Sequence, residues 1–292
     1  MFTPRYHAIT LVAVFLALGI GVVLGVALGE EGIVSGASRD LEKSLRGDVD
    51  SARSRNADLR HELARRRGYE REAYPGLVGG LLPDWTVAVV AMGKLPGGYA
   101  SAIEDAITPA GAQVENVSVI ASPLPLGRIA GDLEGTRLKR LDRDNDVLER
   151  LGRRVGRQLA QGGELLPKLR QELFSTSRGD YRGVDAIVFV RDRDGLKGDE
   201  KSAQDAFERG MIDGMKDTEA PVVGVEKMDT DPSQVPFMAS RGVTSVDDLD
   251  LPEGKTALVW TMIGGSEGQF GRKSTAKHLL PPPPESAAAS RR

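Results

Sequence analysis

The chain has 292 residues, 40% of them hydrophobic, and no cysteine, so it can bury one sizeable core but cannot form a disulfide framework. The formal net charge is −3 at pH 7, which does not indicate broad affinity for nucleic acid.

The first predicted element is a transmembrane helix over residues 8–29. This run carries no charged side chain, and at about 1.5 Å per residue it spans roughly 33 Å, the thickness of a bilayer core. Arg5 precedes the run and the next basic residue is Arg39, so the positive-inside rule places residues 1–7 in the cytoplasm and the rest outside. A cleaved signal peptide is the alternative, but its apolar region is normally only about 7 to 15 residues long.

Small residues recur every fourth position along this helix. Ala17, Gly21 and Gly25 lie on this ladder, although glycine is a poor helix former. Small residues four apart let two membrane helices approach closely, so these three predict a helix–helix interface. The alternative is that glycine and alanine are simply frequent in membrane helices.

Residues 38–74 are predicted to form a coiled-coil stalk, joined to the membrane helix by residues 30–37. Asn56 falls at an a position, where a lone asparagine fixes the register of parallel coiled coils. A homo-oligomer is therefore expected; the alternative is one amphipathic helix lying on the globular domain. The seam alternates spacings of four and three: Leu45, Val49, Ala52, Asn56, Leu59 and Leu63.

Residues 75–271 are predicted to be a three-layer α/β domain with a mostly parallel sheet, because short β-branched runs alternate with helical segments. Residues 272–292 are rich in proline and alanine and predict a disordered tail. The predicted strands are 85–92, 114–120, 184–190, 221–228 and 256–263, and the predicted helices are 98–110, 132–174, 200–217 and 232–241.

Two stretches resemble a known family. The opening RYHAITLVAVFLALGIGVVLG and the late GGSEGQFG (264–271) are similar to the start and the C-terminal glycine-rich signature of the MctB-type copper transporter family of actinobacterial envelope proteins. The resemblance implies a role in copper homeostasis, in an outer-membrane channel needed for efflux, with copper as the transported ion. No cofactor is predicted from the sequence. The matching residues of the opening are Arg5, His7, Ala8, Leu11, Val14, Phe15, Ala17, Leu18, Gly21 and Gly25.

The residues themselves offer few ligands for a metal. Met211 and Met215, four apart on a predicted helix, are candidate soft donors for Cu(I), although methionine at this spacing is more often core filler. Asp192 and Asp194 follow a predicted strand at the edge where open α/β sheets bind ligands, and are candidates for a hard cation or polar ligand; a solvated loop is the alternative.

No nucleophile–base or paired-acid constellation has a usable spacing, so an enzyme is not predicted. The main alternative to copper transport is a membrane scaffold or sensor whose α/β domain binds a partner or small ligand. A weaker one is an anchored enzyme that uses Asp192 and Asp194.

Overall fold

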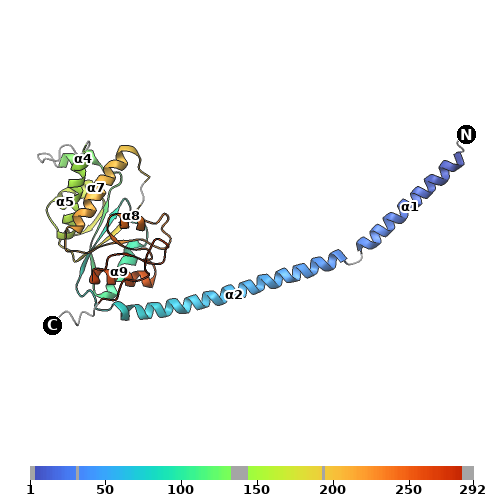
Figure 1. Ribbon diagram of the computed structural model, residues 1–292, viewed down its shortest axis with the longest axis horizontal. Coiled ribbons are helices and arrows are strands. Elements are labelled where there is room, and N and C mark those ends of the chain that lie inside the picture. The colour runs from blue at the N-terminus through green and yellow to red at the C-terminus, as the bar shows by residue number, and fades with distance from the viewer. Residues whose placement is uncertain (1–3, 31–32, 133–143, 193–194, 285–292) are drawn as a thin grey trace. The chain divides into compact units, whose positions relative to one another are not determined.

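The computed structural model describes residues 4–30, 33–132, 144–192 and 195–284 of the chain (Figure 1). The chain divides into two compact units, Met1–Gly68 and Tyr69–Arg292, and each is described by itself.

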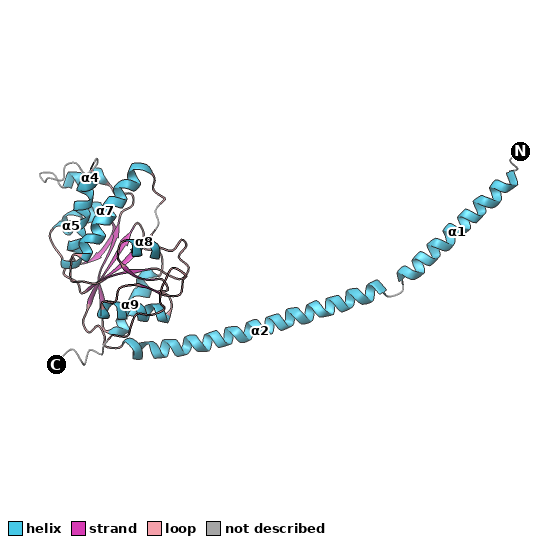
Figure 2. Cartoon of the chain, in the orientation of Figure 1, coloured by secondary structure: helices cyan, strands magenta, loops and turns pink. Residues whose placement is uncertain are grey.

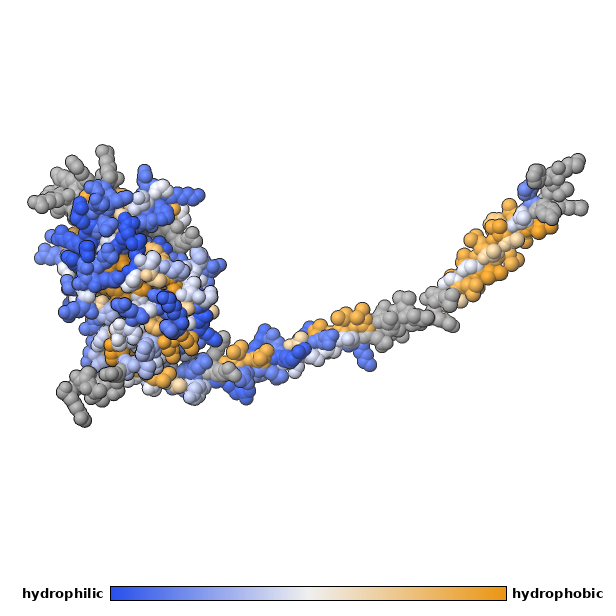
Figure 3. Space-filling model, in the orientation of Figure 1, coloured by the Kyte–Doolittle hydropathy of each residue, from blue (hydrophilic) through white to orange (hydrophobic). Residues whose placement is uncertain are grey.

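The first unit is made of helix α1 (Pro4–Glu30) and most of helix α2 (Ile33–Val78). Within α1, the segment His7–Ala27 is 21 residues long, apolar enough to cross a membrane, and not buried anywhere. Orange, hydrophobic side chains dominate this helix in Figure 3. An apolar helix over the predicted residues 8–29 is thus confirmed, and its crossing of a membrane stays a prediction.

Helix α2 is longer than the predicted stalk. It begins at Ile33, inside the predicted joint 30–37, and continues through Pro75 to Val78. Its last part belongs to the second unit, because Tyr74 and Val78 are buried in the core of that unit and the Tyr74 hydroxyl donates to the carbonyl oxygen of Ala106 at 2.6 Å. The predicted boundary at residue 75 therefore falls inside a helix. Pairing of two stalks stays a prediction.

The second unit is built on one seven-stranded sheet with the strand order β3-β2-β1-β4-β5-β6-β7. All neighbouring strands are parallel except β2 and β3, which confirms the predicted α/β class with a mostly parallel sheet. The strands are β1 Thr86–Met92, β2 Gln113–Ile120, β3 Phe174–Gly179, β4 Ala186–Arg191, β5 Val222–Val225, β6 Thr244–Val246 and β7 Gln269–Phe270.

Helices cover the sheet on both faces, as continuous apolar strands require (Figure 2). Strand β1 shows the division: Ala88, Val90 and Met92 face a core shared with α4 to α8, whereas its alternate residues face a core shared with α3, α9 and the end of α2. The helices are α3 Tyr99–Ile107, α4 Leu126–Asp132, α5 Asn145–Gln161, α6 Leu165–Leu173, α7 Gly198–Lys216, α8 Val235–Ser240 and α9 Pro252–Gly264, with a 3-10 turn at Thr108–Ala110.

The last crossover of the sheet differs from the others. The connections from β4 to β5 and from β5 to β6 pass over the α7 face, whereas the connection from β6 to β7 moves in the same direction but passes over the opposite face through α9. Its hand is therefore opposite to theirs, which is rare for parallel strands. This unusual connection consists of α9 and the short segments that join it to β6 and β7.

Helices α5 and α7 touch backbone to backbone through four glycines. A Cβ at Gly152 or Gly156 of α5 would overlap the backbone of α7, and a Cβ at Gly210 or Gly214 of α7 would overlap the backbone of α5. Each helix thus carries a G-x-x-x-G pair facing the other. This contact was not predicted from the sequence, where the four-residue spacing of glycines was recognised only in residues 8–29.

One predicted strand, 256–263, is wrong: these residues lie in α9. The segment is apolar and β-branched, but periodicity alone cannot separate a buried strand from a buried helix. Helix signals flank it, since Pro252 is the first helical residue and Gly265 caps the end at φ +58°. Seven of the 13 residues of α9 are buried and only Gly264 is exposed, so its sequence shows little of a polar face.

The predicted disordered tail is also wrong over residues 272–284, which belong to the folded unit. The backbone N–H of Gly271 donates to the carbonyl oxygen of His278, and Leu280 packs against the core on the α9 side of the sheet. Strands β3, β6 and β7 and helix α4 were not predicted; the last two strands are only three and two residues long.

Candidate functional site

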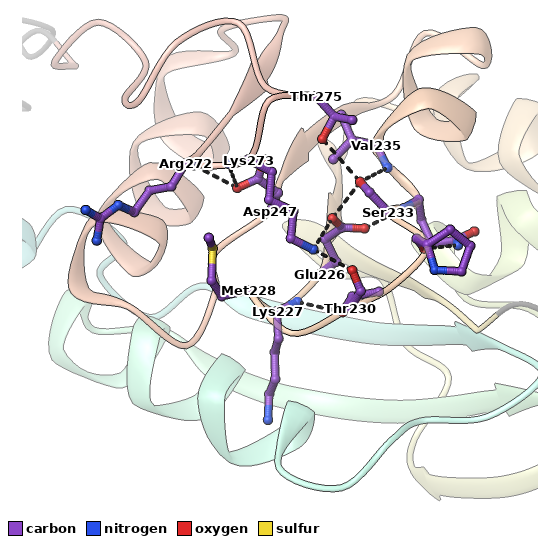
Figure 4. Close-up of polar contacts among 12 residues, drawn as sticks. Glu226, Lys227, Met228, Thr230, Ser233, Val235, Asp247, Arg272, Lys273 and Thr275 are labelled. Carbon is purple, nitrogen blue, oxygen red and sulfur yellow. Dashed lines mark hydrogen bonds and ion pairs between the residues drawn. The ribbon is translucent and has the colours of Figure 1, made fainter. Parts of the chain in front are cut away.

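Polar and charged side chains gather at the carboxyl edge of the sheet, where β4, β5, β6 and β7 end. Open α/β sheets bind ligands at this edge. Figure 4 shows the segment after β5, from Glu226 to Val235, against the segment after β7, from Arg272 to Thr275, with Asp247 between them.

Glu226 is the centre of the cluster. It directly follows β5 and is 3% exposed. One carboxylate oxygen accepts from the Lys273 ammonium at 2.7 Å and from the Ser233 hydroxyl at 2.7 Å, and the other accepts from the backbone N–H of Gln234. The Lys273 ammonium also donates to the Thr230 carbonyl oxygen at 2.8 Å. This is a buried ion pair whose remaining hydrogen-bonding capacity is largely used.

Asp247, which directly follows β6, is held by the segment after β7. Its carboxylate accepts the backbone N–H groups of Arg272 at 2.8 Å and of Lys273 at 3.2 Å. Burial raises the pKa of Asp247, and these two N–H groups oppose the rise. Gly271 makes the seat possible: it has φ +131°, and a Cβ there would overlap the Asp247 carboxyl group. The last glycine of GGSEGQFG is therefore explained by packing.

Asp248 is fully buried, and neither carboxylate oxygen has a hydrogen-bond partner among the residues that the structure describes. Burial raises its pKa to about 7, and the charges of Asp247 and Glu253 add to the rise. Gly254 lies against it, because a Cβ there would be 2.5 Å from one carboxylate oxygen. The folded protein therefore holds this carboxyl group protonated across most of the acidic range.

Arg191, at the end of β4, extends the cluster along the edge. Its guanidinium donates to both carboxylate oxygens of Glu208, at 2.7 and 3.2 Å, and to the side-chain oxygen of Gln234 at 2.7 Å. It also lies 3.9 Å from the ring centre of Phe237. Burial raises the pKa of Glu208, and Arg191 opposes the rise. Gln234 thus links the Arg191–Glu208 pair to the Lys273–Glu226 pair in one network.

The acids of this edge offer hard oxygen donors, and two of them, Glu208 and Glu226, are already paired with internal cations. No group of three or more His, Cys, Asp or Glu side chains is placed to hold a metal ion within the residues that the structure describes. Met228 lies at the same edge, is 41% exposed and offers a soft sulfur donor. Its backbone N–H donates to Asp250 at 2.8 Å.

A second concavity lies between α3 and the β2–β3 end of the sheet. It has a volume of about 690 Å³, with Val117 and Val119 among its apolar walls and Lys94, Glu104 and Arg178 among its charged ones. Its size is within the range of small-molecule sites.

The family follows from the whole chain. A model of the family described as "Copper transport outer membrane protein, MctB" matches residues 1–281. The chain belongs to the MctB family. None of the curated proteins searched matches the chain. The matched range includes the membrane-helix candidate, the stalk, every strand of the sheet and the segment that carries Lys273. The resemblance drawn from the two ends of the sequence is thereby confirmed.

The structure separates the residues that the sequence singled out as metal candidates. Met211 and Met215 are fully buried on α7, in the core between that helix, α5 and the sheet. Asp192 follows β4 and is partly exposed, and its backbone N–H donates to the carbonyl oxygen of Met92 at 3.1 Å. Asp194 lies outside the described residues. The two methionines therefore fill the core, whereas Asp192 lies at the carboxyl edge of the sheet.

The interface candidates lie in the first unit. Ala17, Gly21 and Gly25 are exposed on α1, and a Cβ at either glycine would meet nothing within 4 Å. Asn56 is exposed on α2. Their pairing with another chain stays a prediction.

Sequence reasoning missed the central residues of the edge cluster, Glu226, Asp247, Asp248 and Lys273. The signal for two of them was present in DDLDLPEG (247–254), where acids crowd a turn between apolar runs. No periodicity pointed to Lys273, because it lies in the segment predicted to be a tail.

Proposed function

We propose that this protein is a copper-homeostasis protein of the cell envelope, anchored by α1 and working with its α/β domain outside the cytoplasm. The observation that carries the proposal is the match of a copper-transport family to residues 1–281, together with one candidate membrane span in the described residues. Arg5, on the short N-terminal side, supports the orientation.

The α/β domain has a binding role in this proposal and no catalytic one. The carboxyl edge supports this view, because Glu208, Glu226 and Asp247 are held by internal cations or backbone N–H groups. These three acids and Asp248 are all buried. A conduction path needs rings of carbonyl, charged or coordinating groups, which the apolar side chains of His7–Ala27 do not supply. Copper movement therefore needs further copies of the chain or a partner.

The experiment is intracellular copper measured in a deletion strain during copper challenge. We expect copper to accumulate in the deletion strain, and the full chain to restore the wild-type level. A matched variant carries a cleavable signal peptide in place of residues 1–29, so that the domain is exported without an anchor; it should fail to restore export. Unchanged copper content on deletion would refute the copper role, and full rescue by the unanchored variant would refute the anchored mechanism.

Methionine variants test where soft donors act. Replacing both Met211 and Met215 with leucine should leave copper content and protein level unchanged, because similar-sized apolar swaps in a core cost less than about 1.5 kcal/mol. Met228→Leu is the matched exposed change and is expected to raise retained copper. Loss of copper tolerance in the core double variant at normal protein level would place the donor in α7 instead.

Self-association through α1 is part of the proposal. Replacing Gly21 and Gly25 with leucine would force two such helices apart, whereas leucine is the better helix former and favours insertion. Cross-linking through a cysteine at position 22, Val22→Cys, should fall in the double variant while the membrane yield holds. Unchanged cross-linking would show that the glycines form no interface and only reflect how frequent glycine is in membrane helices.

A further inference from the structure

Helix α2 carries an apolar stripe that nothing else described in the first unit covers. All side chains from residue 41 to residue 65 are exposed. The large apolar ones of the heptad seam keep about half or more of their surface in water: Leu45 55%, Val49 46%, Leu59 64% and Leu63 51%. Orange patches mark this stripe along α2 in Figure 3. Such a stripe on a solvated helix indicates a missing partner helix.

The positions beside the seam carry a charge pattern that selects the partner's direction. With Val49 and Asn56 at a positions, Arg46, Arg53 and Arg60 all occupy e positions. An antiparallel pair of identical helices would place e against e, so arginine would face arginine throughout. A parallel pair places e against g of the other helix.

In a parallel pair, the residues at the g positions attract these arginines at one contact and repel them at another. Asp48 at g faces Arg53 of a second copy across a parallel seam, which is attractive. Arg55 at g faces Arg60 of a second copy, which is repulsive. The mixed contacts of the parallel pair are better than the uniform repulsion of the antiparallel one.

The asparagine points the same way. In a parallel, in-register pair, Asn56 faces Asn56 of the second copy, and the two amides satisfy each other. In an antiparallel pair an a residue faces a d residue, and the d residues here are Leu45, Ala52 and Leu59. The amide would then lie among apolar groups without a partner, which is costly.

We propose that α2 binds a second copy of this chain as a parallel, in-register, two-stranded coiled coil, with its direction set by the Asp48–Arg53 contacts and the Asn56 pair. β-branched Val49 at a and leucine at two of the d positions favour two strands. The inference rests on α2 alone and does not depend on the copper role.

Cross-linking tests the seam in the full chain, which has no native cysteine. Val49→Cys places a thiol at an a position, and Ser54→Cys places one on the outer f position as the matched control. Oxidation of membranes should give covalent dimers at position 49 several-fold faster than at position 54. Equal rates would mean random collision and would overturn the proposal.

A charge exchange tests the direction and register. Asp48→Arg alone places arginine against Arg53, and Arg53→Asp alone places aspartate against Asp48, so each variant should pair with itself several-fold less than wild type. Co-expressed with different tags, the two variants should recover each other at the wild-type level, since opposite charges then meet in both contacts. Absence of this mutual rescue would overturn the register.

The two proposals fail separately. Loss of pairing in the single charge variants with copper export intact would leave the copper role standing, and loss of export on gene deletion says nothing about the stalk.

Discussion

Asp248 makes the stability of the folded unit depend on pH in a predictable direction. Its pKa is raised from 3.8 to about 7 because the carboxyl group is buried and faces the charges of Asp247 and Glu253. Between these two values the folded state holds a proton that the unfolded state has released. The free energy of unfolding therefore falls as pH rises from about 4 to about 7.

The size of the effect follows from the shift. About three pKa units at about 1.4 kcal/mol each give up to about 4 kcal/mol of stability that is present in acid and lost above neutral pH. This is a large fraction of the 5 to 15 kcal/mol that stabilises a typical domain. The side chain is fully buried, so solvent screens little of this effect.

Asp248→Asn removes the titration and keeps the shape. The buried amide adds an offset that does not change with pH, so the informative quantity is the slope. Urea unfolding of the detergent-solubilised full chain at intervals from pH 4 to pH 8.5 should show the variant gaining about 2 to 4 kcal/mol relative to wild type across that range. Asp229→Asn, an exposed change that is not among the charges raising the pKa of Asp248, is the control and should follow the wild-type curve. Parallel curves for wild type and Asp248→Asn would refute the reasoning.

Three further predictions concern packing, charge and topology. Gly214→Ala puts a Cβ 2.7 Å from the carbonyl carbon of Arg153, where ordinary contact needs at least 3.4 Å, so it should destabilise the fold by about 1 to 3 kcal/mol in urea unfolding despite better helix propensity. The control is the exposed Gly127→Ala in α4, which should be neutral or stabilising because nothing lies within 4 Å of the new Cβ. An equal loss of stability in both variants would contradict the packing argument. Lys273→Met leaves Glu226 buried without its cation and should cost about 3 to 5 kcal/mol, and adding Glu226→Gln should recover much of it; additive losses in this double-mutant cycle would contradict the pair. A reporter fused after residue 292 should be active only outside the cytoplasm, and cytoplasmic activity would reverse the orientation inferred from Arg5.

Most of the sheet could be predicted because its strands are buried on both faces and therefore read as apolar runs. The runs 85–92, 114–120 and 184–190 each contain a strand at nearly the predicted place. The run 256–263 was wrongly predicted as a strand for the same physical reason, because the buried part of a helix is also an apolar run. Strands β6 and β7 escaped because three and two residues are too few to show an alternation.

The edge cluster could be predicted only in part, because its members come from segments that are distant in sequence. Glu226 and Lys273 are 47 residues apart and meet only because β5 and β7 end at the same edge, on either side of β6. The glycine-rich stretch before Lys273 was visible in the sequence. The physical reason for its last glycine was not visible, because a Cβ at Gly271 would overlap the carboxylate of Asp247, which lies 24 residues earlier.

The glycines through which α5 and α7 contact each other suggest a role for the glycines spaced four residues apart on α1. Within this chain, α5 and α7 show the effect of glycines four residues apart. One face of each helix carries no side chain at these positions, so the two backbones come into contact. Gly21 and Gly25 have the same spacing on α1, yet a Cβ on either would meet nothing within 4 Å. Glycine costs a helix about 1 kcal/mol against alanine in water, and α5 and α7 recover that cost through close packing. If α1 obeys the same physics, its glycine strip is the place where a second membrane helix belongs, which is why the cross-linking yield of the Gly21 and Gly25 leucine variant decides whether the ladder is an interface.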